Sequence, residues 1–290
     1  MSESTVIVTG ASGFIGANLV RHLRSRGWRV RALVRDIPAE RLEGVDYFAY
    51  DLAREPVEDA FPGAGFLVHG AYVRHTASPD SDRINVDGAR ALLALCRSHG
   101  VKPLFLSSFS AHEGATSHYG RMKLEVERVF DPGRDLILRP ALVVGRGGLF
   151  GSLARFTADR QIIPLMGSGR QKLQTLAVAD LCLVIERGLA KGICGTYRIA
   201  HPAPVTLRGI LEALAARRGR KAHFVPIPMG LVLLACRVAE ALGVRLPVDS
   251  DSVLGLKHSQ VFDTAGDVAV FGVNPMPLKE SLLAMKAPGS

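Results

Sequence analysis

A glycine-rich loop between an apolar run and a helical pattern is the feature that most restricts how this chain can fold. The β-branched run over residues 5–9 predicts a buried strand, and residues 17–26 predict a helix. Between them, glycines permit a tight turn, a close approach of the backbone to a pyrophosphate, and close packing of helix on strand. The sequence therefore predicts a dinucleotide-binding turn, with contacts from Gly10, Ser12, Gly13, Phe14, Ile15 and Gly16.

The first half of the chain alternates short apolar runs with longer helical patterns, which is typical of a parallel sheet with crossover helices. Beyond Arg139 and Pro140 this pattern changes, because glycines and prolines break the chain into loops. We expect strands at residues 5–9, 29–34, 46–50, 66–69, 103–107, 136–138 and 195–200, and helices at 17–26 and 85–98.

The predicted fold class is α/β, a Rossmann-type doubly wound parallel sheet with a smaller C-terminal substrate-binding domain. We expect residues 1–145 plus 173–200 to form the NAD(P)-binding Rossmann domain. Residues 146–172 plus 201–290 are then expected to form the substrate-binding cap.

A tyrosine and a lysine, Tyr119 and Lys123, stand four residues apart, which places them on one face of a helix. A free tyrosine has a pKa of about 10 and is a poor base at neutral pH. A neighbouring ammonium favours the phenolate and lowers that pKa, so the pair suits proton transfer at a substrate oxygen. Three serines precede the pair, at positions 107, 108 and 110.

The spacing GxxGxxG, followed by these serines and by Tyr119 and Lys123, resembles the extended and atypical short-chain dehydrogenase/reductases, also called the NAD-dependent epimerase/dehydratase family. The resemblance covers nearly the whole chain. It implies hydride transfer by a nicotinamide cofactor, Tyr119 as acid/base, and Lys123 at the ribose hydroxyls. It also implies that Ser108 donates a hydrogen bond to the reacting oxygen, with Ser107 and Ser110 as weaker candidates.

The choice of cofactor depends on Arg35, which directly follows the second expected strand and lies 19 residues after Gly16. An acidic residue there would bind the ribose 2′-hydroxyl, whereas arginine offers a planar fork to a 2′-phosphate. The sequence favours NADP, and the adjacent Asp36 leaves NAD open. The resemblance adds Asp51 and Leu52 at the adenine ring, Ala71 beside the ribose, Pro140 near the nicotinamide, and Asn85 in support of the active-site helix.

The substrate is less constrained than the cofactor. Where nucleotide-sugar enzymes of the family commonly supply an arginine to the diphosphate, this chain has Leu173. Arg170 and Lys172 lie close enough in sequence to supply charge, which leaves an anionic substrate open, although a point charge does not replace a fork equally.

We therefore expect an NAD(P)-dependent oxidoreductase that acts on a small-molecule carbonyl or alcohol, with Tyr119 as acid/base. One alternative is a nucleotide-sugar epimerase or dehydratase, in which a bound cofactor oxidises the substrate transiently. The other is a non-catalytic NADP-binding subunit or sensor. The resemblance adds a homodimer that pairs through the helices of Asn85 and Tyr119.

Positive charge is concentrated in the second half of the chain. Residues 1–145 hold 18 Lys and Arg against 17 Asp and Glu, whereas residues 146–290 hold 18 against 10. A solvated basic face explains this excess, and a site for an anionic substrate or a membrane surface is the sharper alternative. Nucleic acid is not expected as a partner, because no DNA-binding motif accompanies the basic runs.

The remaining sequence features indicate an ordinary cytoplasmic protein. The N-terminus lacks the pattern of a signal peptide, and four scattered cysteines form no metal or redox motif, so no metal is expected. The longest apolar helical stretch, Met229 to Cys236, is about half the length needed to cross a bilayer. We expect it to form a buried helix.

Overall fold

The computed structural model describes residues 4–75, 78–158, 160–217, 219, 222–244, 246 and 248–285. The chain divides into two compact units. The first comprises residues 1–111, 121–139 and 182–197, and the second comprises residues 112–120, 140–181 and 198–290.

A seven-stranded sheet forms the centre of the first unit. Its strands lie in the order β11-β6-β5-β4-β1-β2-β3, so the chain starts in the middle and reverses direction across the sheet at β1. Strand β1 pairs in parallel with β2 on one side and β4 on the other, with Val6 opposite Val30 and Phe66. The bounds are β1 Thr5–Thr9, β2 Arg29–Val34, β3 Val45–Ala49, β4 Phe66–His69, β5 Lys102–Leu106, β6 Leu136–Pro140 and β11 Gly195–Ile199.

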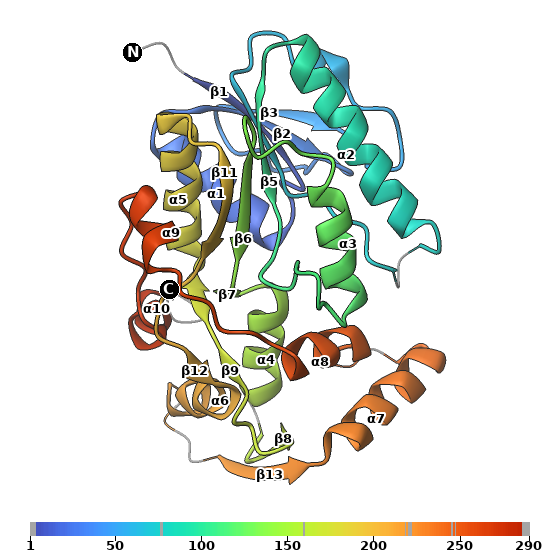
Figure 1. Ribbon diagram of the computed structural model, residues 1–290, viewed down its shortest axis with the longest axis vertical. Coiled ribbons are helices and arrows are strands. Elements are labelled where there is room, and N and C mark those ends of the chain that lie inside the picture. The colour runs from blue at the N-terminus through green and yellow to red at the C-terminus, as the bar shows by residue number, and fades with distance from the viewer. Residues whose placement is uncertain are drawn as a thin grey trace. The chain divides into compact units, whose positions relative to one another are not determined.

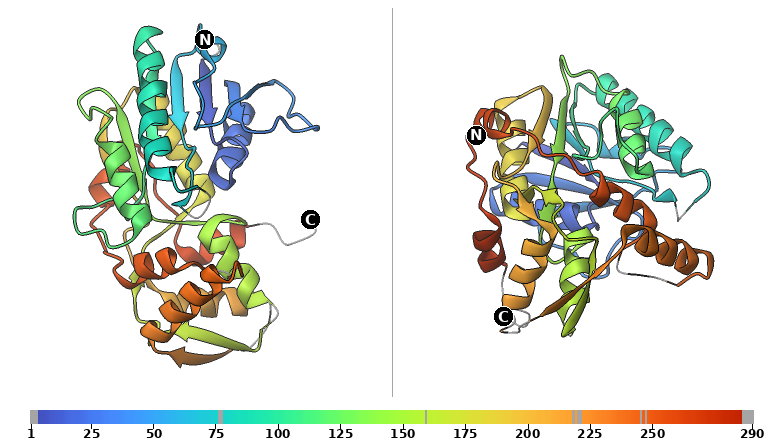
Figure 2. Two further views of the ribbon diagram at one scale, coloured as in Figure 1. Left: turned by 90° about the vertical axis from the view of Figure 1, so that its right-hand side faces the viewer. Right: turned by 60° about the horizontal axis from the view of Figure 1, so that its bottom comes forward.

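Helices cover both faces of this sheet (Figures 1 and 2). On one face lie α1 (Phe14–Ser25) and α5 (Val178–Lys191), where His22 contacts Glu186 at 2.7 Å. On the other lie α2 (Ser81–Ser98) and α3 (His118–Glu127), which pack on Phe105 and Ile137 of the sheet. A short 3-10 turn, η1 (Glu58–Ala60), precedes β4. The predicted doubly wound α/β fold is confirmed.

The second unit has its own apolar core, which includes Phe150, Ile163 and Leu211. Gln174 ties its loops together, because its side-chain amide donates to the carbonyl of Phe262 at 3.0 Å and accepts from the same residue's N–H at 2.9 Å. The strands are β7 Leu142–Val144, β8 Ile162–Met166, β9 Lys172–Leu173, β10 Thr175–Ala177, β12 Val205–Thr206 and β13 His223–Ile227. The helices are α4 Gly148–Ala158, α6 Leu207–Ala216, α7 Met229–Ala241, α8 Ser250–Lys257, α9 Ala265–Val270 and α10 Leu278–Ala284.

The strands of the second unit were not predicted, because several are too short to produce a periodic pattern. Strands β9 and β12 have two residues each, and β7 and β10 have three. They form separate pairs, β7 with β10, β9 with β12 and β8 with β13.

The apolar stretch from Met229 to Cys236 is helical, as predicted, but the expectation that it is buried is wrong. Within α7 only Cys236 is buried, although Met229 and Leu233 also pack on the core of the second unit. The opposite side of the helix is equally apolar, and Leu231 and Leu234 there are exposed. Among the described residues, no helix has the length and apolar character needed to cross a membrane.

Candidate active site

The glycine loop joins β1 to α1 in a conformation that excludes side chains at two of its positions. Gly10 has a φ of +66°, and a Cβ there would lie 2.8 Å from the backbone nitrogen of Ala71. A Cβ on Gly16 would lie 2.2 Å from the carbonyl oxygen of Gly10. The turn is closed by the N–H of Gly13, which donates to the Gly10 carbonyl at 2.9 Å. The backbone therefore requires glycine at both positions.

The start of α1 fits the pyrophosphate of a dinucleotide. The helix has 12 residues, its N-cap Gly13 provides no side-chain hydrogen bond, and its first turn contains no acidic residue. Ser12 and Gly13 are exposed, whereas Phe14 and Ile15 are half-buried. Helix N-termini bind anions through unsatisfied N–H groups and the helix dipole. Gly10, Gly13 and the start of α1 thus form a cradle of the kind expected from the sequence.

Thr9 and His69 hold the ends of β1 and β4 together, a role that the sequence analysis missed. The Thr9 hydroxyl oxygen accepts from the N–H groups of Gly70 and Ala71, both at 3.2 Å. Its own proton is then available to donate to Nδ1 of His69, 2.8 Å away. The His69 ring is therefore neutral, with its proton on Nε2. Burial, with a smaller contribution from the charge of Lys123, lowers the pKa of His69 to about 3.

This buried neutral histidine predicts acid sensitivity. In the unfolded chain His69 binds a proton at a pKa of about 6.5, whereas the folded protein binds it only at a pKa of about 3. Between these values the unfolded state holds the extra proton, so stability falls as pH falls, by up to about 1.4 kcal/mol per pH unit. Urea unfolding from pH 7 to pH 4 measures this dependence. His69→Gln cannot titrate, so its unfolding free energy should fall less steeply; parallel curves would contradict the assignment.

The other predicted cofactor positions lie at the ends of strands in the first unit. Arg35 is exposed and directly follows β2. Asp51 accepts from the N–H of Ala53 at 2.9 Å, so its carboxylate also closes a turn. Leu52 is buried against α2, where a Cβ on Gly88 would lie 2.5 Å from it. The Ala71 N–H donates to Thr9, so the carbonyl is the backbone group that Ala71 can offer a ligand.

A buried cluster around Glu127 distinguishes the two serines that follow β5. Ser107 is buried and donates to the Glu127 carboxylate, which also receives hydrogen bonds from Nε and Nη2 of Arg139, with Nε to Oε1 at 2.9 Å. Ser108 is only half-buried, and its hydroxyl accepts from the N–H of Ser110 at 3.2 Å. The Ser107 hydroxyl is therefore occupied within the cluster, whereas Ser108 and Ser110 are both half-buried. Glu127 follows Lys123 by four residues, a spacing that could have revealed it.

Lys123 is almost fully buried on α3. Its ammonium donates to the carbonyl of Leu106 at 2.7 Å and lies 4.7 Å from the centre of the Phe105 ring. Burial lowers the pKa of Lys123 to about 7, and the nearby Glu127 carboxylate opposes that shift. The pKa of Lys123 therefore lies well below that of an ordinary lysine, which is about 10.4.

Tyr119 lies in the first turn of α3, where a distant carboxylate caps the helix. Asp251 of α8 accepts from the N–H of Tyr119 at 2.9 Å and from the N–H of His118. Ser117 adds a second cap, since its hydroxyl accepts from Gly120 at 3.1 Å. Because α3 is continuous from His118 to Glu127, Tyr119 and Lys123 lie on one face, as predicted. Asp251 carries no sequence signal, since it lies 132 residues away from Tyr119.

Asn85 clamps the segment that follows β4. It is buried on α2, donates to the carbonyl of Val73 at 2.8 Å and accepts from the N–H of the same residue at 2.9 Å. The amide therefore fixes the backbone just beyond Ala71. Pro140 is buried at the end of β6.

Comparison with known proteins identifies the family. The model of the "NAD dependent epimerase/dehydratase family" matches residues 6–200. The chain belongs to the NAD-dependent epimerase/dehydratase family. It is 35% identical over 270 residues to the ceramide reductase of Caulobacter vibrioides, covering 88% of this chain and 83% of that protein. It is 36% identical over 269 residues to the sterol demethylase protein B of Methylococcus capsulatus, covering 79% of each.

A solved structure of MoeE5 in complex with UDP-glucuronic acid and NAD has the same fold. The TM-score is 0.73 at 21% identity, with 97% of each chain covered. This family consists of NAD(P)-dependent enzymes, and the glycine cradle of α1 is where such a cofactor fits.

Leu173 departs from the arginine expected in nucleotide-sugar members of the family, and the structure gives it a packing role. It is buried in the core of the second unit and pairs with Val205 between β9 and β12. Its neighbours Arg170 and Lys172 are exposed. A buried leucine cannot be exchanged for a charged group without leaving that charge in the core.

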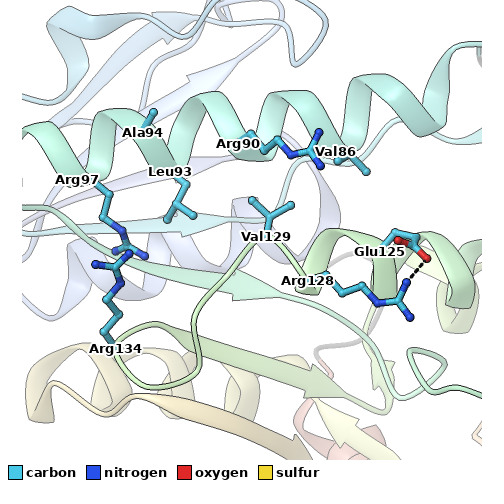
Figure 3. Close-up of a pocket in the computed structure, with 9 residues that line it drawn as sticks. All are labelled: Val86, Arg90, Leu93, Ala94, Arg97, Glu125, Arg128, Val129 and Arg134. Carbon is cyan, nitrogen blue, oxygen red and sulfur yellow. Dashed lines mark hydrogen bonds and ion pairs between the residues drawn. The ribbon is translucent and has the colours of Figure 1, made fainter.

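A groove of about 550 Å³ between α2 and α3 lies apart from these residues (Figure 3). Four arginines line it, but each is paired with a carboxylate. The pairs are Arg90 with Asp87, Arg97 with Asp135, Arg128 with Glu125, and Arg134 with Asp131. The groove therefore has little net charge to offer an anion, and none of the predicted site residues lines it.

Proposed function

We propose that this protein is an NAD(P)-dependent oxidoreductase that interconverts a carbonyl and an alcohol on a substrate with a large apolar part. The observation that carries the proposal is the arrangement of three polar side chains, two on α3 and one after β5. Tyr119 and Lys123 share one helical face, and Ser108 is half-buried while Ser107 is committed to Glu127. A non-catalytic binding protein would need the glycine cradle but not this complete set.

Each residue has a distinct role in the proposed reaction. The nicotinamide, when bound, supplies or accepts the hydride. Tyr119 gives a proton to the substrate oxygen in reduction and takes it back in oxidation. Ser108 donates a hydrogen bond to the same oxygen, which stabilises the negative charge that develops there. Protonated Lys123 favours the phenolate of Tyr119 and binds ribose hydroxyls.

Two observations support an apolar substrate over a nucleotide sugar. Two relatives named above are, by their names, a ceramide reductase and a sterol demethylase protein. Ceramides and sterols both have large apolar parts. Leu173 packs in the core where a diphosphate-binding arginine would otherwise stand. The nucleotide-sugar epimerase remains the second candidate, because the fold is shared with a protein solved with UDP-glucuronic acid and NAD.

One assay separates these two reactions. A reductase consumes NADPH or NADH in proportion to product, whereas an epimerase returns the hydride and shows no net consumption. The purified protein is incubated with either cofactor and with a ceramide-type ketone, a sterol ketone or UDP-sugars, and absorbance at the nicotinamide band is followed. Net oxidation with a lipid ketone is expected; interconversion of UDP-sugars without net oxidation would establish the epimerase instead.

The proposed cofactor is NADP, because Arg35 is exposed directly after β2 and can present its fork to a 2′-phosphate. We expect Arg35→Asp to weaken NADPH binding by at least about tenfold, or about 1.4 kcal/mol, and to leave NADH binding unchanged or improved. Calorimetric titration of both cofactors measures this. As a control, Arg29→Asp alters an exposed arginine at the opposite end of β2 and should affect neither. Tighter binding of NADH than NADPH by the unmodified protein would refute the choice.

Three further proposals follow from the sequence analysis. Residues 1–145 plus 173–200 bind the cofactor, and residues 146–172 plus 201–290 bind the substrate. The protein acts in the cytoplasm. It forms a homodimer through α2 and α3, whose groove would then be covered.

A further inference from the structure

Helix α7 has two apolar faces, and only one of them packs against the protein. Met229, Val232 and Leu233 contact the core of the second unit, and Cys236 is buried in it. Their spacing of three and four residues defines one side of the helix. This side accounts for the stability of α7, but it leaves the remaining apolar residues unexplained.

The other face of α7 is apolar and open. Leu231 is 57% exposed, Leu234 is 58% exposed and Val238 is 49% exposed. They lie three and four residues apart, so they form a second stripe on the opposite side of the helix. Leu242, directly after the helix, extends the stripe and is 73% exposed. Single exposed apolar residues are normal, but a continuous stripe marks an interaction surface.

The apolar stripe lies within a strongly basic segment. Residues 217–245 contain six basic residues and one acidic residue, Glu240. Arg237 is exposed on α7 itself, and Arg217 is exposed at the end of α6. The others are Arg218, Arg220, Lys221 and Arg245, which lie outside the described residues and count only by their place in the sequence. An apolar helical face with basic flanks is complementary to a bilayer surface, where an apolar acyl region lies beneath anionic headgroups.

We infer that the exposed face of α7 docks on the surface of a bilayer that contains anionic lipids. The helix has 13 residues, so it lies in the interface with its apolar stripe at the acyl boundary and does not span the membrane. A second copy of the chain is a poorer occupant, because pairing two such faces brings like charges together. Figure 1 shows α7 beside α8, which leaves its other side free of helices and strands of the second unit.

The test is flotation of the full chain with vesicles. Vesicles of phosphatidylcholine with about 30% phosphatidylglycerol should bind the protein at least about tenfold more tightly than phosphatidylcholine alone, and raised salt should weaken the binding. The double variant Leu231→Gln/Leu234→Gln should lose at least about tenfold in binding. The matched control Leu283→Gln changes a leucine that is 84% exposed on α10 and should bind as before.

A second measurement covers the case in which the double variant unfolds. Leu234→Trp keeps the face apolar, and its fluorescence should shift to the blue on anionic vesicles; Leu283→Trp should show no shift. The inference is overturned if the protein does not bind anionic vesicles. It is equally overturned if the variants on α7 give the same result as the matching Leu283 controls in both experiments. It is also overturned if sedimentation shows a dimer that the Leu231→Gln/Leu234→Gln variant abolishes while vesicle binding is absent. Vesicle binding requires no turnover, so the outcome is independent of the proposed reaction.

Discussion

Replacing the hydroxyl of Tyr119 should abolish turnover while the cofactor still binds. Tyr119→Phe removes the group that exchanges a proton with the substrate oxygen, and general acid–base groups contribute about 10²- to 10⁴-fold to the rate. We expect kcat to fall by that factor. Cofactor affinity should be unchanged, because the cradle of Gly10, Gly13 and α1 is untouched. Stopped-flow measurement of nicotinamide oxidation gives kcat, and calorimetry gives the affinity.

The control for this variant is another tyrosine of the chain. The Tyr197 hydroxyl donates to the carbonyl of Cys194 at 3.0 Å, and Tyr197 lies far from Tyr119 in the sequence. Tyr197→Phe should therefore keep its turnover. Full activity in Tyr119→Phe would show that Tyr119 is not the acid/base.

A methyl group on Gly16 should disrupt the cofactor site from within. Its Cβ would lie 2.2 Å from the carbonyl oxygen of Gly10 and 2.8 Å from the Cα of Ala11, both of them backbone atoms that cannot rotate away. The loop must open or α1 must shift, either of which moves the N–H groups that face the pyrophosphate. We expect Gly16→Ala to weaken cofactor binding by at least about tenfold and to lower the unfolding free energy by about 1–3 kcal/mol.

The control is a glycine with open space around it. Gly266 in α9 has a permissive conformation and no atom near the position of a Cβ, so Gly266→Ala should be neutral or slightly stabilising. Calorimetric titration and urea unfolding of both variants make the comparison. Normal cofactor affinity in Gly16→Ala would mean that this loop does not hold the pyrophosphate.

The sequence predicted the parts of the molecule that depend on near neighbours along the chain. The runs at residues 5–9, 29–34 and 66–69 match β1, β2 and β4 to the residue, because a buried parallel strand is a continuous apolar run bounded by turn residues. The glycine loop and the pair Tyr119 and Lys123 could also be recognised in the sequence, because they too depend on near neighbours. Their geometry is set by spacing alone, either in a tight turn or on one turn of helix.

The tertiary structure decided which side chains from distant segments of the chain become partners. It brought the Ser107 hydroxyl to the Glu127 carboxylate, which also binds Arg139. It brought Asp251 to the start of α3, 132 residues away in sequence from Tyr119. Neither contact follows from periodicity, because a side chain's partner is fixed by packing and not by its own neighbours.

Helix α7 shows the same division most clearly. Apolar spacing predicted a helix from Met229 onward, and the helix is present. The same apolar residues predicted burial, and on one side of α7 that prediction was wrong, since Leu231 and Leu234 are exposed. Hydropathy states that a side chain avoids water, but only the folded chain determines whether protein covers it. The sequence thus determined what α7 is, and the tertiary structure decided that one of its faces remains available to another surface.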